Sequence, residues 1–237
     1  MEIGKRKILF KMGRLMNQTP VHDAHNHDLL ELIPLNSKKV IEIGCSSGAL
    51  AREFKKRNNF VDWVGVEIDP IYAELAKRYC DKTLVLDIDV CVMDFYEQFA
   101  DRDVWIFGDT LEHLKDPWSV LKLIRKTIPD NGSIVACIPN AQHWSLVIRM
   151  AIGDFRYEDS GLLDKTHLRW FSRQTIMELF TTSGYKVVEG VPRIFNEPNQ
   201  EKFLPLIGEI AKACEIDPDL VIKDAIPLQY VIRAMPV

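Results

Sequence analysis

The stretch from residue 40 to 50 constrains the fold of this chain more than any other. It reads VIEIGCSSGAL, so a β-branched run ends at Gly44 and a helical pattern begins at Ala49. The pattern predicts a strand over 39–43, a turn of small residues and a helix over 49–57. At the carboxyl end of such a strand, small residues let a ligand approach the backbone and the helix N-terminus. We therefore expect a nucleoside-like cofactor at this turn.

Acidic residues end the next two predicted strands. Glu67 closes the run over 60–67, and Asp87 closes the run over 83–87. An acid at the second strand tip is suited to accept hydrogen bonds from both hydroxyls of a ribose. A carboxylate at the third tip can accept from an adenine amino group. The spacing of these acids predicts that an adenosine lies across the three strand tips.

Several motifs in order resemble those of class I S-adenosylmethionine-dependent methyltransferases. The runs EIGCSSG at 42–48 and GVEIDP at 65–70, together with Asp87, resemble the first three motifs of that superfamily. The run GDTLEHLKDP at 108–117 resembles the fourth-strand motif, and DNGSIV at 130–135 resembles the turn into the fifth strand. Within the superfamily the chain is most similar to the ubiquinone-biosynthesis-type small-molecule methyltransferases, many of whose bacterial relatives accompany polysaccharide or secondary-metabolite genes.

This resemblance covers roughly residues 28–190 and implies a fold and a cofactor. The implied fold is α/β: a Rossmann-like, seven-stranded, mostly parallel sheet with an antiparallel last strand, helices on both faces and a lid inserted after strand five. The implied cofactor is S-adenosylmethionine, with S-adenosylhomocysteine as product. Ser46 departs from the pattern, because it occupies the place of the usual middle glycine. The cofactor contacts expected from these motifs are Glu42, Gly44, Cys45, Ser46, Gly48, Glu67, Ile68, Asp87, Ile88 and Asp109.

The length of the chain bounds its domain organisation. With 237 residues it is long enough for one α/β domain with a small lid and too short for two full enzyme domains. We expect a single methyltransferase domain over 1–237. Within it we expect an N-terminal strap or cap over 1–34, a substrate lid over 140–171 and a helical insertion over 196–225 before the last strand. The lid is expected to close over the acceptor.

Composition and charge bear on partners and compartment. No stretch approaches the ~20 apolar residues of a membrane span, and a net charge of -4 gives no general footprint for nucleic acid. The five cysteines are scattered, without a C-x-x-C pair, and the N-terminus does not resemble a secretory signal. These features predict a cytoplasmic protein with a small-molecule acceptor. The apolar stripe of the insertion suits either core packing or a homodimer contact.

Two histidines are the candidate catalytic residues. Methyl transfer to a hydroxyl requires alignment of the acceptor and removal of its proton, and histidine is the natural base near neutral pH. His113 follows the fourth strand, His167 lies in the lid, and Asp109 or Asp164 could orient them. The resemblance supports His167, which together with Thr166 matches a histidine of the ubiquinone-type enzymes.

The lid also holds the expected substrate contacts. Its polar and aromatic side chains suit a polar ring such as a sugar or a phenol. The residues that we expect to contact the acceptor are His143, Trp144, Asp164 and Arg169.

We assign no metal ligand from the sequence. The run Asp109-x-x-Glu112-His113 nevertheless resembles an acid-x-x-Glu-His run that binds a divalent ion in some ubiquinone-type enzymes, so a metal stays open there. Three further histidines precede the first strand, and no regular spacing brings their imidazoles together. These are His22, His25 and His27.

The predicted function is therefore transfer of a methyl group to a hydroxyl of a saccharide or secondary metabolite. N- or C-methylation of a small molecule is an alternative. A nicotinamide-dependent oxidoreductase would require G-x-G-x-x-G, and Gly44, Ser46 and Ala49 match this poorly. A non-catalytic methyltransferase-fold module is favoured only by Ser46, whereas Glu67 and Asp87 argue against it.

Overall fold

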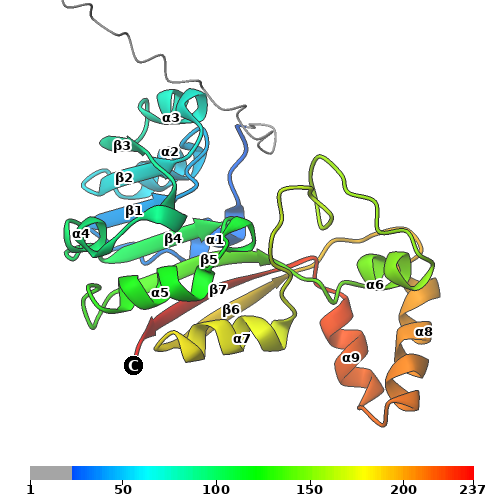
Figure 1. Ribbon diagram of the computed structural model, residues 1–237. Coiled ribbons are helices and arrows are strands. Elements are labelled where there is room, and N and C mark those ends of the chain that lie inside the picture. The colour runs from blue at the N-terminus through cyan, green and yellow to red at the C-terminus, as the bar shows by residue number, and fades with distance from the viewer. Residues whose placement is uncertain (1–22) are drawn as a thin grey trace, which may run out of the picture.

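The computed structural model describes residues 23–237 (Figure 1). The amphipathic stretch over 1–20 and His22 lie outside the described residues, as does most of the strap expected over 1–34. Within the described part of the chain, no helix is long and apolar enough to cross a membrane.

A seven-stranded sheet forms the centre of the part of the chain that the structure describes. The strand order is β3-β2-β1-β4-β5-β7-β6, and β7 runs antiparallel to both of its neighbours while the other pairs are parallel. The order reverses between β1 and β4, which places the ligand crevice of such a sheet at the carboxyl ends of these strands. The predicted fold class is confirmed. The strands are β1 (Lys39–Ile43), β2 (Asp62–Glu67), β3 (Lys82–Val85), β4 (Val104–Gly108), β5 (Ser133–Pro139), β6 (Tyr185–Arg193) and β7 (Gln229–Pro236).

Helices cover both faces of this sheet, and strand β4 shows why its sequence is apolar throughout. Val104 and Ile106 pack in the core under α1, α2 and α3, whereas Trp105 and Phe107 pack in the core under α4, α5 and α7. A strand buried on both faces reads as a continuous apolar run rather than an alternating one. These helices are α1 (His27–Leu32), α2 (Ala49–Arg57), α3 (Pro70–Ala76), α4 (Met93–Glu97), α5 (Pro117–Arg125) and α7 (Arg173–Thr182).

Aspartate followed by proline begins three of the helices. Asp69, Asp116 and Asp217 each accept a hydrogen bond from a backbone N–H of the first turn, and the proline that follows each occupies the first helical position. The carboxylate satisfies an amide that has no partner within the helix, while proline fixes a helical φ where no N–H is needed. The third of these helices is α9 (Pro218–Ala225).

The segment predicted to be a lid, residues 140–171, follows β5 and contains helix α6 (Trp144–Ala151); we keep the name lid for it. Its two ends meet, because the Ala141 N–H donates to the Phe171 carbonyl at 2.8 Å. Figure 1 shows α6 standing beside the sheet with α8 (Gln200–Ala213) and α9. The three helices share a small apolar core of Trp144, Ile207 and Ala225. The long connection between β6 and β7 therefore supports the lid helix.

Candidate functional site

The turn after β1 is built from three residues with left-handed backbone. Gly44 has φ +75°, Gly48 has φ +78°, and Ser46, where the usual glycine is missing, has φ +47°. A Cβ atom on Gly44 would lie 2.6 Å from Thr110 Oγ1, so any side chain there would require Thr110 to shift. Ser46 is small, but it still pays the steric cost of a left-handed conformation.

Glu67, at the end of β2, braces this turn. Its Oε2 accepts from the Ser46 N–H at 2.8 Å, and its Oε1 accepts from the amides of Ile68 and Asp69 at 2.8 and 3.0 Å. Burial raises the pKa of the Glu67 carboxyl, and the amide hydrogen bonds oppose that shift. The carboxylate that we expect to bind a ribose is thus also the group that holds the first two strand tips together.

The other expected cofactor contacts lie around the same three tips. Glu42 is buried, accepts from Trp63 Nε1 at 3.0 Å, and has a pKa well above its usual range because of that burial. Asp87 accepts from the Asp89 N–H at 2.9 Å. The side chain of Ile68 is exposed and that of Ile88 is buried.

Cys45 contributes to the core rather than to the crevice through its side chain. Its sulfur and that of Cys80 would lie 2.7 and 2.9 Å from a Cβ atom on Gly65, so the two thiols fill the space beside that glycine. Any contact of Cys45 with a cofactor would come from its backbone.

The loop after β4 is joined to the first turn. Thr110 Oγ1 donates to the Ile43 carbonyl at 3.0 Å, which fixes the loop against the end of β1. Asp109 adopts φ +52° and is exposed, and Gln229 Nε2 donates to its Oδ1. The Asp109 carboxylate therefore lies at the edge of the sheet, next to the turn where a cofactor is expected.

A buried acid and two imidazoles meet beyond this loop. The rings of His113 and His167 are 4.7 Å apart, and His167 Nε2 lies 4.0 Å from Glu112 Oε1. One ligand-type atom from each of the three residues lies within 4.8 Å of the others. Glu112 is 1% exposed, and neither of its carboxylate oxygens has a hydrogen-bond partner among the described residues. The arrangement suits either proton transfer or coordination of a cation.

Hydrogen bonds assign the proton on each ring. Thr166 Oγ1 donates its single proton to Asp164 at 2.6 Å, so at 3.0 Å it must accept from His113 Nδ1. His167 Nδ1 faces the Leu162 carbonyl at 3.4 Å, which can only accept. Both rings therefore carry their proton on Nδ1, and each Nε2 keeps a lone pair.

Burial sets the charge state of the cluster. It lowers the pKa of His113, lowers the pKa of His167 to about 4, and raises the pKa of Glu112 well above its usual range. Near neutral pH the two imidazoles are uncharged and can accept a proton or bind a cation.

The second half of the lid is fixed to this cluster. The Leu168 and Arg169 amides donate to the Glu112 carbonyl at 2.8 and 2.9 Å. The guanidinium of Arg169 donates to the backbone carbonyl of Lys115, and Asp164 is buried beside Thr166. The structure thus brings the two predicted catalytic histidines together, with Asp164 next to them.

The remaining substrate candidates lie elsewhere in the lid. His143 is 2% exposed, its Nδ1 is 2.8 Å from Ser145 Oγ, and burial lowers its pKa to about 4. Trp144 stacks on Phe203 of α8 with a centroid distance of 5.7 Å. Trp144 belongs to the small core of α6, α8 and α9, and the His143 ring lies against it at 5.6 Å. Their role in acceptor binding stays a prediction. Arg193 and Gln229 were not predicted as site residues, and Glu112 was considered only as a possible metal ligand.

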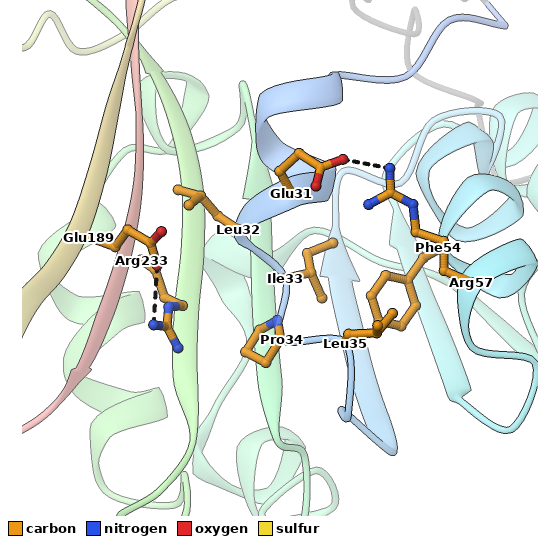
Figure 2. A pocket seen from close by; sticks show the side chains of 9 residues that line it. All are labelled: Glu31, Leu32, Ile33, Pro34, Leu35, Phe54, Arg57, Glu189 and Arg233. Carbon is orange, nitrogen blue, oxygen red and sulfur yellow. Dashed lines mark hydrogen bonds and ion pairs between the residues drawn. The ribbon is translucent and has the colours of Figure 1, made fainter.

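A cavity of about 350 Å³ lies away from this edge of the sheet (Figure 2). It is open to solvent and is lined by the end of α1, the segment that leads into β1, the last turns of α2, and strands β6 and β7. Its charged groups pair with one another, Arg57 with Glu31 at 2.5 Å and Arg233 with Glu189 at 3.2 Å. Since Leu35 of its lining precedes β1, the cavity is on the side of the amino ends of the parallel strands, and we assign it no part in the chemistry.

A methyltransferase domain family matches residues 21–190 of the chain. The chain belongs to this family. The match spans the first five strands, the lid and most of β6, so it includes the strand tips and the histidine cluster. Together with the fold, it confirms the predicted class of this methyltransferase and its predicted cofactor, S-adenosylmethionine.

Relatives and solved structures agree with that class. The methyltransferase is 28% identical over 123 residues to the ubiquinone biosynthesis O-methyltransferase of Histophilus somni, a match that covers 48% of this chain and 51% of that protein. The chain thus spans about half the length of that curated relative. It is also 28% identical over 160 residues to a protein of Leptospira interrogans named as an uncharacterized RNA methyltransferase, covering 64% of this chain and 35% of that one. A SAM-dependent methyltransferase from Archaeoglobus fulgidus has a similar fold, with a TM-score of 0.59, 18% identity and coverage of 88% and 91%.

Proposed function

We propose that the protein transfers the methyl group of S-adenosylmethionine to a hydroxyl of a small molecule, a saccharide or secondary metabolite. The observation that carries a hydroxyl acceptor is the pair of neutral imidazoles at the end of β4, where each Nε2 keeps a lone pair. Such a hydroxyl loses its proton as the methyl group arrives, and an uncharged imidazole can take that proton.

The reaction needs two bonds to change and one proton to move. The carbon–sulfur bond of the sulfonium breaks with its electron pair on sulfur, which yields S-adenosylhomocysteine, while the methyl carbon bonds to the acceptor oxygen. The oxygen's proton passes to an imidazole. We assign this role first to His113, which is half-buried, because His167 is only 7% exposed. His167 would then position His113 and its acceptor.

A second candidate uses the same cluster to hold a divalent cation. The residues fit, because two imidazole lone pairs converge within 4.8 Å on a fully buried carboxyl that has no hydrogen-bond partner in residues 23–237. The cation would lie between Glu112, His113 and His167, and it would supply Lewis-acid stabilisation of an acceptor oxygen. Asp109, the acid of the family-like run, is turned toward Gln229 instead.

A chelator separates the two candidates. Dialysis against EDTA should leave the melting temperature and the turnover unchanged if the histidines act as a base. If EDTA instead lowers both the melting temperature and the turnover, and Mn²⁺ or Zn²⁺ restores them in the unaltered protein but not in Glu112→Gln, the cluster binds a cation. Glu97→Gln is the matched control, because Glu97 is exposed on α4 and belongs neither to the cluster nor to the expected cofactor site.

We favour a small-molecule acceptor over RNA. The O-methyltransferase name of one relative supports the small molecule, whereas the RNA name of the other belongs to a protein of which the match covers 35%. A net charge of -4 also gives no general electrostatic support for binding a polyanion. The cytoplasmic location and a homodimer stay predictions.

Two measurements test the proposed function. Calorimetry should show that S-adenosylhomocysteine binds, and transfer of a labelled methyl group should be assayed against phenols, catechols, sugars and bulk transfer RNA. We expect label in one hydroxyl-bearing small-molecule class. Label only in RNA, or on nitrogen or carbon, would overturn the acceptor assignment, and absence of binding would overturn the cofactor assignment.

A further inference from the structure

Four polar side chains form a continuous line across the carboxyl edge of the sheet. Asp28 of α1 accepts from Arg193 Nε at 2.9 Å, Arg193 Nη1 donates to Gln229 Oε1, and Gln229 Nε2 donates to Asp109 Oδ1. Each residue comes from a different element: α1, the end of β6, the start of β7 and the loop after β4. The line therefore joins α1 to the loop after β4, which contacts the turn after β1 where we expect the cofactor.

The direction of donation along this line is fixed by chemistry. A guanidinium can only donate and a carboxylate can only accept, so the amide between them must turn its oxygen to Arg193 and its NH₂ to Asp109. The two contacts orient Gln229, and Gln229 in turn orients Asp109. Cys137 adds a weaker contact, with its Sγ 3.5 Å from Asp109 Oδ1.

The topology explains why these residues meet. Arg193 ends β6, Gln229 begins the antiparallel β7, and Asp109 directly follows β4, so all three lie at one edge of the sheet. Asp109 has φ +52°, in the left-handed region that residues other than glycine seldom adopt. Backbone strain of this kind is retained where surrounding contacts impose it and is concentrated at functional sites.

The position of Asp109 points to one part of the cofactor. The neighbouring Thr110 is fixed to the carbonyl of Ile43, which directly precedes the first turn. The acids expected to hold the adenosine, Glu67 and Asp87, lie on the other side of that turn, at the ends of β2 and β3. An anionic carboxylate on the β4 side is therefore placed for the amino-acid end of the cofactor, whose α-amino group is a cation.

We propose that Arg193 and Gln229, anchored by Asp28, are positioning residues that hold the Asp109 carboxylate for the α-ammonium group of S-adenosylmethionine. The inference rests on the proposed function, because it names how one part of the same cofactor is held. A charge-assisted hydrogen bond from ammonium to carboxylate depends on geometry. The line of side chains supplies that geometry without touching the adenosine.

The test compares two nucleosides that differ only at the amino-acid end. S-adenosylhomocysteine carries the homocysteine moiety, whereas 5′-methylthioadenosine has the same adenosine and thioether sulfur but no ammonium group. Calorimetry would give the ratio of the two affinities for the unaltered protein, Arg193→Met, Gln229→Met and Asp109→Asn. Arg233→Met is the matched control, since Arg233 lies on the same strand as Gln229 and pairs with Glu189, outside the line.

We expect each of the three variants to lose about tenfold or more in affinity for S-adenosylhomocysteine, with affinity for methylthioadenosine unchanged. Arg233→Met should keep the ratio of the unaltered protein. Equal loss for both nucleosides would show that the line is merely structural, and unchanged affinities would show that it does not act on the cofactor; either result overturns the proposal. If the unaltered protein binds neither nucleoside, the cofactor assignment falls and this proposal falls with it.

Discussion

The imidazole rings of His113 and His167 meet edge to face at 4.7 Å, although one follows β4 and the other comes from the lid. The Glu112 carbonyl, which accepts two lid amides, holds the two segments in this position. A lid fixed in this way brings a second imidazole to the strand tip where the reacting methyl group is expected.

Removing either imidazole should lower the rate of methyl transfer without weakening the binding of the cofactor. We expect His113→Ala, which removes the proposed base, to reduce kcat by ~100- to 10,000-fold. His167→Ala, which removes its positioning partner, should also reduce kcat, but by less. Affinity for S-adenosylhomocysteine should stay nearly unchanged, because the residues that we expect to hold it, at the first three strand tips and at Asp109, are left intact. The exposed His27 provides the control variant, His27→Ala. If both His113→Ala and His167→Ala kept near-normal turnover, neither imidazole would be the base. Alignment of the acceptor and its desolvation would then account for the rate.

Hydrogen exchange should divide the lid into two parts. Residues 155–161 are exposed, whereas Leu168 and Arg169 donate their amides to Glu112. We expect the first part to exchange rapidly and these two amides slowly, since exchange follows the free energy of local opening. Adding cofactor together with acceptor should slow the first part, as expected for closure over the acceptor. The lid would instead be a fixed wall if its exchange were the same with and without both compounds.

The regular elements of this fold were predictable because their signals are local. The β-branched run before Gly44, the aspartate–proline starts of α3 and α5, and the apolar β4 each specify structure within a few residues. The order of motifs then fixed the strand tips. His113 and His167 could be paired in advance only through the resemblance to a family, since no spacing in the sequence brings them together.

The features of the site that the sequence did not predict depend on which distant segments meet in the fold. The sequence suggests Glu112 only as one acid of a run that resembles a metal-binding one, and the packing of the lid is what leaves its carboxyl buried without a hydrogen-bond partner in the described structure. Arg193 and Gln229 lie at strand ends with no motif around them, and the antiparallel pairing of β6 and β7 makes them neighbours. Glu67 was expected to face a ribose, and its three backbone amide contacts follow from turn geometry that the sequence does not specify.

The left-handed backbone of Ser46 should lower the stability of the protein. Ser46→Gly should raise the free energy of unfolding by roughly 1 kcal/mol, because glycine adopts a positive φ without the steric cost that serine pays. Gly44→Ala should lower it, since the added Cβ would meet Thr110 Oγ1 at 2.6 Å. Urea denaturation measures both changes. If Ser46→Gly were destabilising, side-chain contacts of Ser46 would outweigh its backbone strain.

Glu67 should matter for cofactor binding and for the turn itself. A hydrogen bond to a charged group contributes about 1.5–3 kcal/mol, so Glu67→Ala should weaken S-adenosylhomocysteine binding at least tenfold. Because the carboxylate also accepts from three backbone amides, the same variant should unfold at a lower temperature. Glu67→Gln keeps one oxygen acceptor and should show smaller losses of both. Calorimetric affinity equal to that of the unaltered protein would remove Glu67 from the cofactor site.

The pH dependence of stability should report the burial of His143. Burial lowers the pKa of this imidazole from its ordinary 6.5 to about 4. Between these values the unfolded chain binds a proton that the folded chain does not, so the free energy of unfolding falls as the pH falls from 6.5 toward 4. At pH 5 the difference from neutral pH should be about 2 kcal/mol for this one group, at ~1.36 kcal/mol per pKa unit.

His143→Asn isolates that contribution from the other buried histidines. The variant loses the titrating ring, so its melting temperature should fall less between pH 7 and pH 5 than that of the unaltered protein. The two falls should differ by about 4–8 °C, at about 2–4 °C per kcal/mol. Its stability at pH 7 is also expected to be lower, because the ring packs near Trp144 and its Nδ1 lies 2.8 Å from Ser145 Oγ. Differential scanning calorimetry at the two pH values measures both. An equal fall in the variant and the unaltered protein would mean that His143 becomes protonated without unfolding, with Glu197, 3.8 Å from its Nε2, as the compensating charge.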